Sequence, residues 1–167
     1  MEVSQNEKAD VIARILEQTG FDRCMAFCNT KGSTERITKF LQMQGIDAEC
    51  IHGDIPQRKR EQVMDKFRRG ELRVFVSTDV AARGIDVDDV EAVINYDLPN
   101  ENEYYLHRIG RTGRAKKHGV AFTLLTYTES VRFDAILKYI MAKPVPLHFN
   151  DMGILVTETG EPFFEDM

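Results

Sequence analysis

The sequence contains no tryptophan and only three cysteines, Cys24, Cys28 and Cys50, among its 167 residues. Three cysteines are too few for a disulfide framework, and none of them forms a CxxC pair typical of zinc sites. We therefore expect buried, reduced thiols and a cytoplasmic protein. No stretch approaches the roughly 18 apolar residues that cross a membrane, and the N-terminus lacks the apolar region of a secretory signal. We expect no membrane partner.

Basic residues are absent from the end of the chain. After Lys143 there is no lysine or arginine but there are five acidic residues, within a formal net charge of -5. Five prolines, eleven glycines and 43% apolar residues are ordinary for a globular protein, and at this length one domain buries about two-thirds of the unfolded chain's surface. We predict a domain over residues 1–143 and an acidic C-terminal tail or linker over 144–167, with a short hairpin turning at Thr159 and Gly160.

Charge is also segregated inside the body of the chain. Residues 58–69 hold six basic and two acidic groups, residues 107–118 hold five basic groups and no acid, and residues 85–103 hold seven acids and no base. Clustered positive charge is typical of a protein that binds a phosphate-rich partner, although solvated helix faces look the same.

Short apolar stretches alternate with amphipathic ones along the chain. Five stretches predict strands, at residues 23–28, 47–51, 73–77, 92–96 and 119–125. The segments between them repeat apolar residues at helical spacing. This order predicts an α/β fold of three layers, a mainly parallel sheet with helices on both faces. Ligands bind such sheets beyond the carboxyl ends of the strands, which here are followed by four polar segments.

The first two of these segments follow the strands at 23–28 and 47–51. Asn29 or Thr30 can cap the next helix and leave backbone N–H groups for an anion. Asp54 with Gln57 fits a capping box, with a proline in the first turn. Gln57 and Arg60 also share a helix face where a phosphodiester would be stabilised. An alternative for both segments is that these residues only cap their helices and bind no phosphate.

The third segment is STDVAARGID, residues 77–86. We predict that Asp79 caps a single helical turn and that Gly84 ends it in the left-handed conformation. That leaves Arg83 and Asp86 unexplained. A carboxylate after a glycine turn can accept a hydrogen bond from a ribose hydroxyl, although Asp86 could equally be a surface acid.

The fourth segment is HRIGRTGR, residues 107–114. Arg108, Arg111 and Arg114 recur every third residue with no carboxylate between them. We predict that His107 and Arg111 share a helix face and that Gly113 ends the helix. A guanidinium matches two phosphate oxygens at once, so the segment predicts a phosphate-binding site.

Together these segments resemble the second RecA-like domain of the DEAD-box ATP-dependent RNA helicases. HGDIPQRKR, STDVAARGID, YDLP and HRIGRTGR occur in that family's order and spacing, and the resemblance covers about residues 5–143. It implies a RecA-like three-layer domain that binds ATP and contacts RNA through its backbone, independently of base sequence.

The resemblance also implies roles for individual residues. Arg111 and Arg114 correspond to arginine fingers that reach the γ-phosphate of ATP. The residues implied to contact the nucleotide are Gly84, Asp86, Arg111, Thr112, Gly113 and Arg114. Those implied to line the RNA backbone are Thr30, Gly32, Gln57, Arg60, Thr78 and Asp79. Those implied to join the two domains are Arg83, His107 and Arg108, of which His107 could instead be structural.

Two motifs of such enzymes are missing. The sequence has no GxxxxGK[ST] loop and no Asp-Glu-Ala-Asp run, and we identify no metal ligands in it. The resemblance therefore implies that an N-terminal RecA-like domain holds the phosphates and Mg²⁺, and that this chain alone does not hydrolyse ATP. Two alternatives remain: a DNA-directed helicase or translocase of the same superfamily, and a non-enzymatic module that binds RNA or protein.

Overall fold

Helices and strands alternate along the chain in the order that the apolar pattern predicts. The computed structural model describes residues 1–85, 87, 89–112 and 119–163. The helices are η1 (Gln5–Glu7), α1 (Lys8–Thr19), α2 (Lys31–Met43), α3 (Gln57–Arg68), α4 (Asp79–Ala82), α5 (Asn102–Ile109) and α6 (Ser130–Ile140). The strands are β1 (Cys24–Cys28), β2 (Ala48–Ile51), β3 (Val74–Thr78), β4 (Ala92–Asn95), β5 (Val120–Thr123), β6 (Leu147–Phe149) and β7 (Leu155–Thr157).

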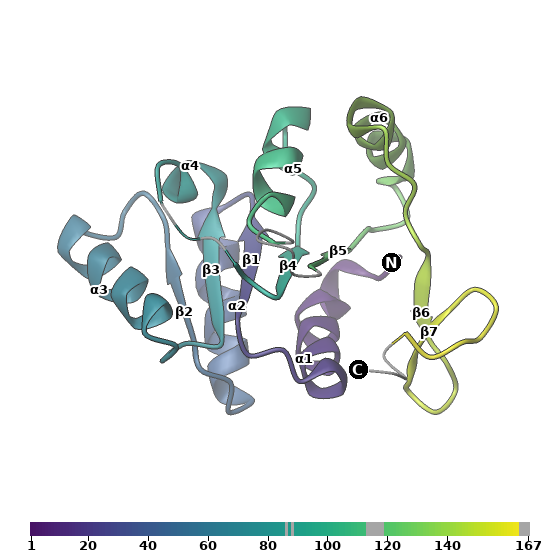
Figure 1. Cartoon of the computed structure of the whole chain (residues 1–167), viewed down its shortest axis with the longest axis horizontal. Coiled ribbons are helices and arrows are strands. Elements are labelled where there is room, and N and C mark those ends of the chain that lie inside the picture. Colours follow the sequence, from purple (N-terminus) through teal and green to yellow (C-terminus); the bar gives the residue numbers. More distant parts are fainter. Residues whose placement is uncertain (86, 88, 113–118, 164–167) are drawn as a thin grey trace.

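The main sheet, as far as the described ranges show it, has five parallel strands in the order β2-β3-β1-β4-β5 (Figure 1). All five predicted strands are confirmed, with ends within two residues of the expected ones. The predicted α/β class, a parallel sheet covered by helices on both faces, is also confirmed. Crossover helices link the strands, so all five carboxyl ends meet at one edge of the sheet.

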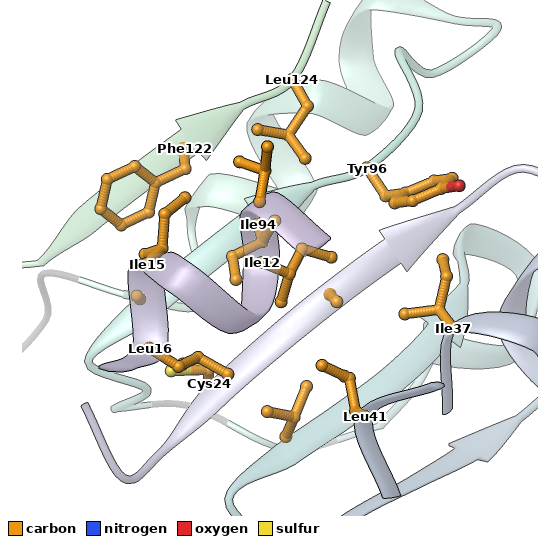
Figure 2. Packing of buried hydrophobic residues seen from close by; sticks show 14 of the residues in the cluster. Ile12, Ile15, Leu16, Cys24, Ile37, Leu41, Ile94, Tyr96, Phe122 and Leu124 are labelled. Carbon is orange, nitrogen blue, oxygen red and sulfur yellow. The ribbon is translucent and has the colours of Figure 1, made fainter. Parts of the chain in front are cut away.

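Both faces of the central strand β1 are buried, which explains why its sequence is a continuous apolar run. Cys24, Ala26 and Cys28 face α1 and α2, whereas Met25 and Phe27 face the side covered by α3 and α4. Figure 2 shows Leu16 of α1 beside Cys24, with Ile12 and Ile15 on the same helix, and Ile37 and Leu41 of α2 packed farther along the same core cluster. Burial raises the pKa of the Cys24 thiol to about 12, which keeps it protonated.

The C-terminal segment packs against α1. Strands β6 and β7 pair antiparallel, and Leu155 is buried in the same core cluster as α1. The side-chain amide of Gln18 donates to Gly153 O at 2.6 Å, and its Oε1 accepts from Leu155 N at 2.8 Å. The expected turn at residues 159–160 is present, since Gly160 N donates to Thr157 O at 3.0 Å. Residues 144–163 are thus packed on the body of the domain, and a boundary at 143 stays a prediction.

The end of β5 is bordered by the N-terminal residues. Val3 N donates to Leu125 O at 2.7 Å, and Leu125 N donates to Met1 O at 2.8 Å.

Within the described ranges, no helix combines the length and the apolar character needed to cross a membrane.

Candidate functional site

The carboxyl edge of the sheet collects the four predicted segments. Asn29 follows β1, Thr78 ends β3, and Asp97 follows β4, while α4 and α5 lie beyond the same edge (Figure 1). Because β3, β1 and β4 are adjacent in the sheet, residues about 20 to 70 positions apart in sequence become neighbours.

Thr30 caps the start of α2, which is one of the two predicted alternatives, Asn29 or Thr30. Thr30 Oγ1 accepts from Ser33 N at 3.1 Å. A methyl group added at Gly32 would lie 3.3 Å from a guanidinium nitrogen of Arg36, a flexible neighbour. The backbone at Gly32 is therefore open enough for close approach, and its contact with RNA stays a prediction, as does that of Thr30.

The start of α3 differs from the predicted capping box. The helix begins at Gln57, Pro56 occupies the cap position, and no side chain caps it. Asp54 accepts instead from Lys31 Nζ at 2.9 Å, and this hydrogen bond lowers the pKa of the Asp54 carboxyl. The expected cap is wrong because the cap position is Pro56, two residues after Asp54, and the Asp54 carboxylate pairs with Lys31 of α2 instead.

Gln57 and Arg60 lie at the amino end of α3, as the spacing predicts. The Gln57 amide donates to Glu61 Oε1 at 3.4 Å, and Arg60 Nη2 donates to Ala81 O at 3.3 Å. Arg60 thereby links α3 to α4, next to Thr78. Neither contact tests the predicted roles of Gln57 and Arg60 toward RNA.

The turn after β3 is capped by Thr78, not by Asp79. Ala81 N donates to Thr78 Oγ1 at 3.3 Å, so the prediction that Asp79 caps is wrong. Gly84 has φ +78°, which confirms the predicted left-handed conformation. No atom lies within 4 Å of a methyl group added at Gly84, so glycine is needed there for its backbone conformation and not for space.

Arg108 is enclosed within the domain. Its side chain is 1% exposed, and its Nε and Nη2 donate to the two carboxylate oxygens of Asp79 at 2.6 and 2.7 Å. Nη1 donates to Asp97 O at 2.5 Å and Nη2 to Asn29 Oδ1 at 3.1 Å. The guanidinium also lies over the Phe27 ring, 5.3 Å from its centroid. The Arg108 side chain thus links the segments that follow β1, β3 and β4.

This placement revises two expectations. Arg108 has no exposed guanidinium to offer a second domain, and both carboxylate oxygens of Asp79 are occupied by Arg108. The sequence pattern hides the pairing because Asp79 is 29 positions away from Arg108. We therefore assign Arg108 to the scaffold of the site, and a contact of Asp79 with RNA remains untested.

Arg111 lies beyond the end of α5, against the Gly84 turn. The helix ends at Ile109, so the prediction that His107 and Arg111 share a helix face is wrong. The Arg111 guanidinium donates to Ile85 O at 2.6 Å, Ala82 O at 3.1 Å and Val87 O at 3.3 Å.

The next residue after Arg111, Thr112, donates through Oγ1 to Val90 O at 2.5 Å. The three other residues of the predicted nucleotide set, Asp86, Gly113 and Arg114, lie outside the described residues. Their roles stay predictions.

A cavity of about 250 Å³ opens between α4 and α5. Arg83, Gly84, His107 and Arg111 all line it. Tyr104 also lines it, and Arg83 Nη2 donates to its hydroxyl at 2.8 Å. None of the four sequence segments includes Tyr104, although its position three residues before His107 on a helix places the two side chains on one face.

A parallel sheet with helices on both faces, whose carboxyl edge gathers arginines beside a glycine turn, is the architecture of a RecA-like α/β domain. The chain belongs to the helicase conserved C-terminal domain family, whose match covers residues 7–116. The predicted resemblance to the second domain of DEAD-box helicases is thereby confirmed.

Known relatives are longer than this chain. It is 42% identical over 148 residues to the ATP-dependent RNA helicase FAL1 of Candida glabrata, covering 87% of this chain and 37% of FAL1. The structure matches a DEAD box protein from the hyperthermophile Methanococcus jannaschii with TM-score 0.79 and 40% identity, covering 85% of this chain and 39% of that one. It matches Saccharomyces cerevisiae Dbp5 bound to RNA and ADP BeF3 with TM-score 0.74 and 34% identity, covering 81% and 37%. The chain thus spans less than two-fifths of these proteins.

Proposed function

We propose that this chain is the C-terminal half of an ATP-dependent RNA helicase. In this role it couples ATP binding and hydrolysis to the unwinding of RNA duplexes or the remodelling of RNA–protein complexes. FAL1 is named as such a helicase, and Dbp5 has been seen with RNA and ADP BeF3. The buried thiols of Cys24 and Cys28 support a cytoplasmic location.

The observation that carries the proposal is the contact between Arg111 and the Gly84 turn. Arg111 Nη1 lies 2.6 Å from Ile85 O, one residue after Gly84. A nucleotide whose ribose is held by this turn, through Asp86, would therefore have its phosphates within reach of Arg111. A guanidinium gains more from a phosphate oxygen than from a neutral carbonyl oxygen, so these residues fit a triphosphate.

RNA would lie along the neighbouring strand ends. Thr30 follows β1, and Thr78 ends the adjacent strand β3. Gly32 is in the first turn of the helix that Thr30 caps, and Arg60 donates to Ala81 O in the turn that Thr78 caps. Hydroxyl groups, helix N-termini and an arginine are groups that bind phosphate and sugar, and such contacts read no base sequence. RNA is therefore expected to bind independently of its sequence.

Hydrolysis would depend on closure of two domains. Mg²⁺ and a phosphate-binding loop, supplied by a first RecA-like domain, would neutralise and position the triphosphate. Arg111 and Arg114 would complete the charge neutralisation only when the two domains meet, which couples hydrolysis to RNA binding. Arginine fingers contribute about 10³- to 10⁵-fold in rate.

The test compares the chain alone with the chain joined to the first domain of a related DEAD-box helicase, here called the two-domain protein. We expect no ATP hydrolysis by the chain alone and RNA-stimulated hydrolysis by the two-domain protein. Arg111→Ala in the two-domain protein is expected to lower the ATPase rate at least about a hundredfold while RNA affinity is largely kept. Arg68→Ala, at an exposed ion pair with Asp65, is the matched control.

Three results would change the conclusion. Steady ATP turnover by the chain alone would refute the division of labour between two domains. Stimulation by single-stranded DNA as strong as by RNA would favour a DNA-directed translocase. RNA binding without ATP turnover in the two-domain protein would favour a non-enzymatic module.

A further inference from the structure

Tyr104 connects two side chains that are predicted to meet the first domain. Arg83 Nη2 donates to the Tyr104 hydroxyl at 2.8 Å, and the Arg83 guanidinium lies 5.8 Å from the centre of the Tyr104 ring. The Tyr104 ring also contacts the ring of His107: the two ring centroids are 6.5 Å apart, and the angle between the ring planes is 38°. All three side chains line the cavity between α4 and α5.

Tyr104 is itself held firmly by the fold. It belongs to the first turn of α5, whose next residue, Tyr105, is buried and shares a hydrogen bond of 2.8 Å with Thr123 of β5. At the start of the same helix, Arg132 Nη1 donates to Asn102 Oδ1 at 2.5 Å. A tyrosine side chain has only two rotatable bonds before its hydroxyl, so a fixed backbone leaves the hydroxyl few positions and little entropy to lose.

Arg83 and His107, by contrast, are exposed residues. A free arginine side chain populates many rotamers and loses that entropy when it binds. Tyr104 offers Arg83 both a hydroxyl acceptor and an aromatic ring, and these two contacts restrict the Arg83 guanidinium before the first domain binds. The ring contact with His107 restricts the imidazole in the same way.

We propose that Tyr104 is a positioning residue that holds Arg83 and His107 in place for the first RecA-like domain. This inference rests on the proposed function. The role assigned to Tyr104 requires no contact with ATP or RNA, because Tyr104 acts through its two neighbours. The first domain then closes onto a surface that is already ordered, which lowers the RNA concentration needed for closure.

The first experiment needs only the 167-residue chain. Side-chain Nε–Hε signals of arginine are recorded by NMR for the unmodified chain, for Tyr104→Phe and for Tyr127→Phe, a 71% exposed tyrosine that serves as the matched control. We expect the Arg83 signal to be resolved in the unmodified chain and in Tyr127→Phe, and to move to the position of a free arginine in Tyr104→Phe. An Arg83 signal unchanged by Tyr104→Phe would overturn the proposal.

The second experiment is a double-mutant cycle in the two-domain protein. Tyr104→Phe is expected to raise the RNA concentration for half-maximal ATPase about fivefold to tenfold, with a much smaller change in kcat. In an Arg83→Ala background the same change should add little, because its target is gone. Full additivity of the two variants would overturn the proposal.

The two experiments separate this inference from the proposed function. A two-domain protein that lacks RNA-stimulated ATPase would refute the proposed function, and with it the partner named for Tyr104. The NMR result would still decide whether Tyr104 holds Arg83. An ordered Arg83 in an active protein that is insensitive to Tyr104→Phe would overturn the positioning role alone.

Discussion

Replacing Arg108 by alanine tests whether this arginine belongs to the scaffold or to the reactive surface. The side chain of Arg108 is 1% exposed and that of its partner Asp79 is 15% exposed. Arg108→Ala would leave the Asp79 carboxylate enclosed without its counter-charge. It would also leave Asn29 Oδ1 and Asp97 O without this donor. We therefore expect a large loss of stability.

The size of the loss follows from the burial of the pair. Removing one partner of a buried ion pair costs about 3–5 kcal/mol. In a protein of this length each 1 kcal/mol lowers Tm by about 2–4 °C, so Tm is expected to fall by about 6–20 °C. Native domains have only about 5–15 kcal/mol of stability, so the variant would lose a large share of it.

The assay is urea unfolding of the 167-residue chain at neutral pH, followed by circular dichroism. Arg68→Ala removes an exposed ion pair with Asp65 and is expected to change the free energy of unfolding by less than about 1 kcal/mol. The double variant Arg108→Met with Asp79→Asn should be less destabilised than Arg108→Met alone, because it leaves no unpaired charge. If Arg108→Ala behaves like Arg68→Ala, Arg108 is not part of the scaffold.

Three further predictions concern single residues elsewhere. Leu155→Ala should lower the free energy of unfolding by about 2–5 kcal/mol in thermal melts, because Leu155 is buried; no change would show that the C-terminal segment is not packed on the domain. Gly32→Ala should keep the stability, since alanine favours a helix, but should weaken binding of labelled single-stranded RNA in fluorescence anisotropy; unchanged affinity would remove Gly32 from the RNA site. Cys24, with its pKa raised to about 12, should have a thiolate fraction of about one in 10⁴ at pH 8 and resist a thiol reagent until the protein unfolds, whereas rapid labelling of Cys24 would contradict its burial.

The sheet could be predicted from the sequence because burial on both faces leaves a simple signal. Strand β1 is apolar at all five positions and β3 at its first three, so each appears as a short continuous apolar run between polar segments. The pairing of β6 with β7 was not predicted. Strand β6 has only three residues, and its two apolar side chains are only half-buried, so its alternation is too short to predict a strand from the sequence.

Helix caps were predictable only where the cap and the helix are neighbours in sequence. Thr30 fits this rule, because its acceptor and the Ser33 donor are three residues apart. Asp54 looks like a cap by the same rule, but Lys31, 23 residues away, takes its carboxylate. Asp79 likewise looks like a cap, and Arg108 takes it. Long-range ion pairs of this kind depend on the fold, so local spacing cannot distinguish a capping carboxylate from a paired one.

The arginine motif shows the same limit for function. Three arginines at equal spacing look equivalent in the sequence, yet the end of α5 at Ile109 separates Arg108 from Arg111. Arg108 points inward to Asp79 and Asp97, and Arg111 lies on the turn that carries Gly84. Because Arg108 fixes the strand ends on which that turn is built, losing it would also displace Arg111. A loss of ATPase in an Arg108 variant would therefore not identify an arginine finger. The free energy of unfolding has to be measured beside the ATPase rate, and only a variant that loses hydrolysis while it stays folded identifies one.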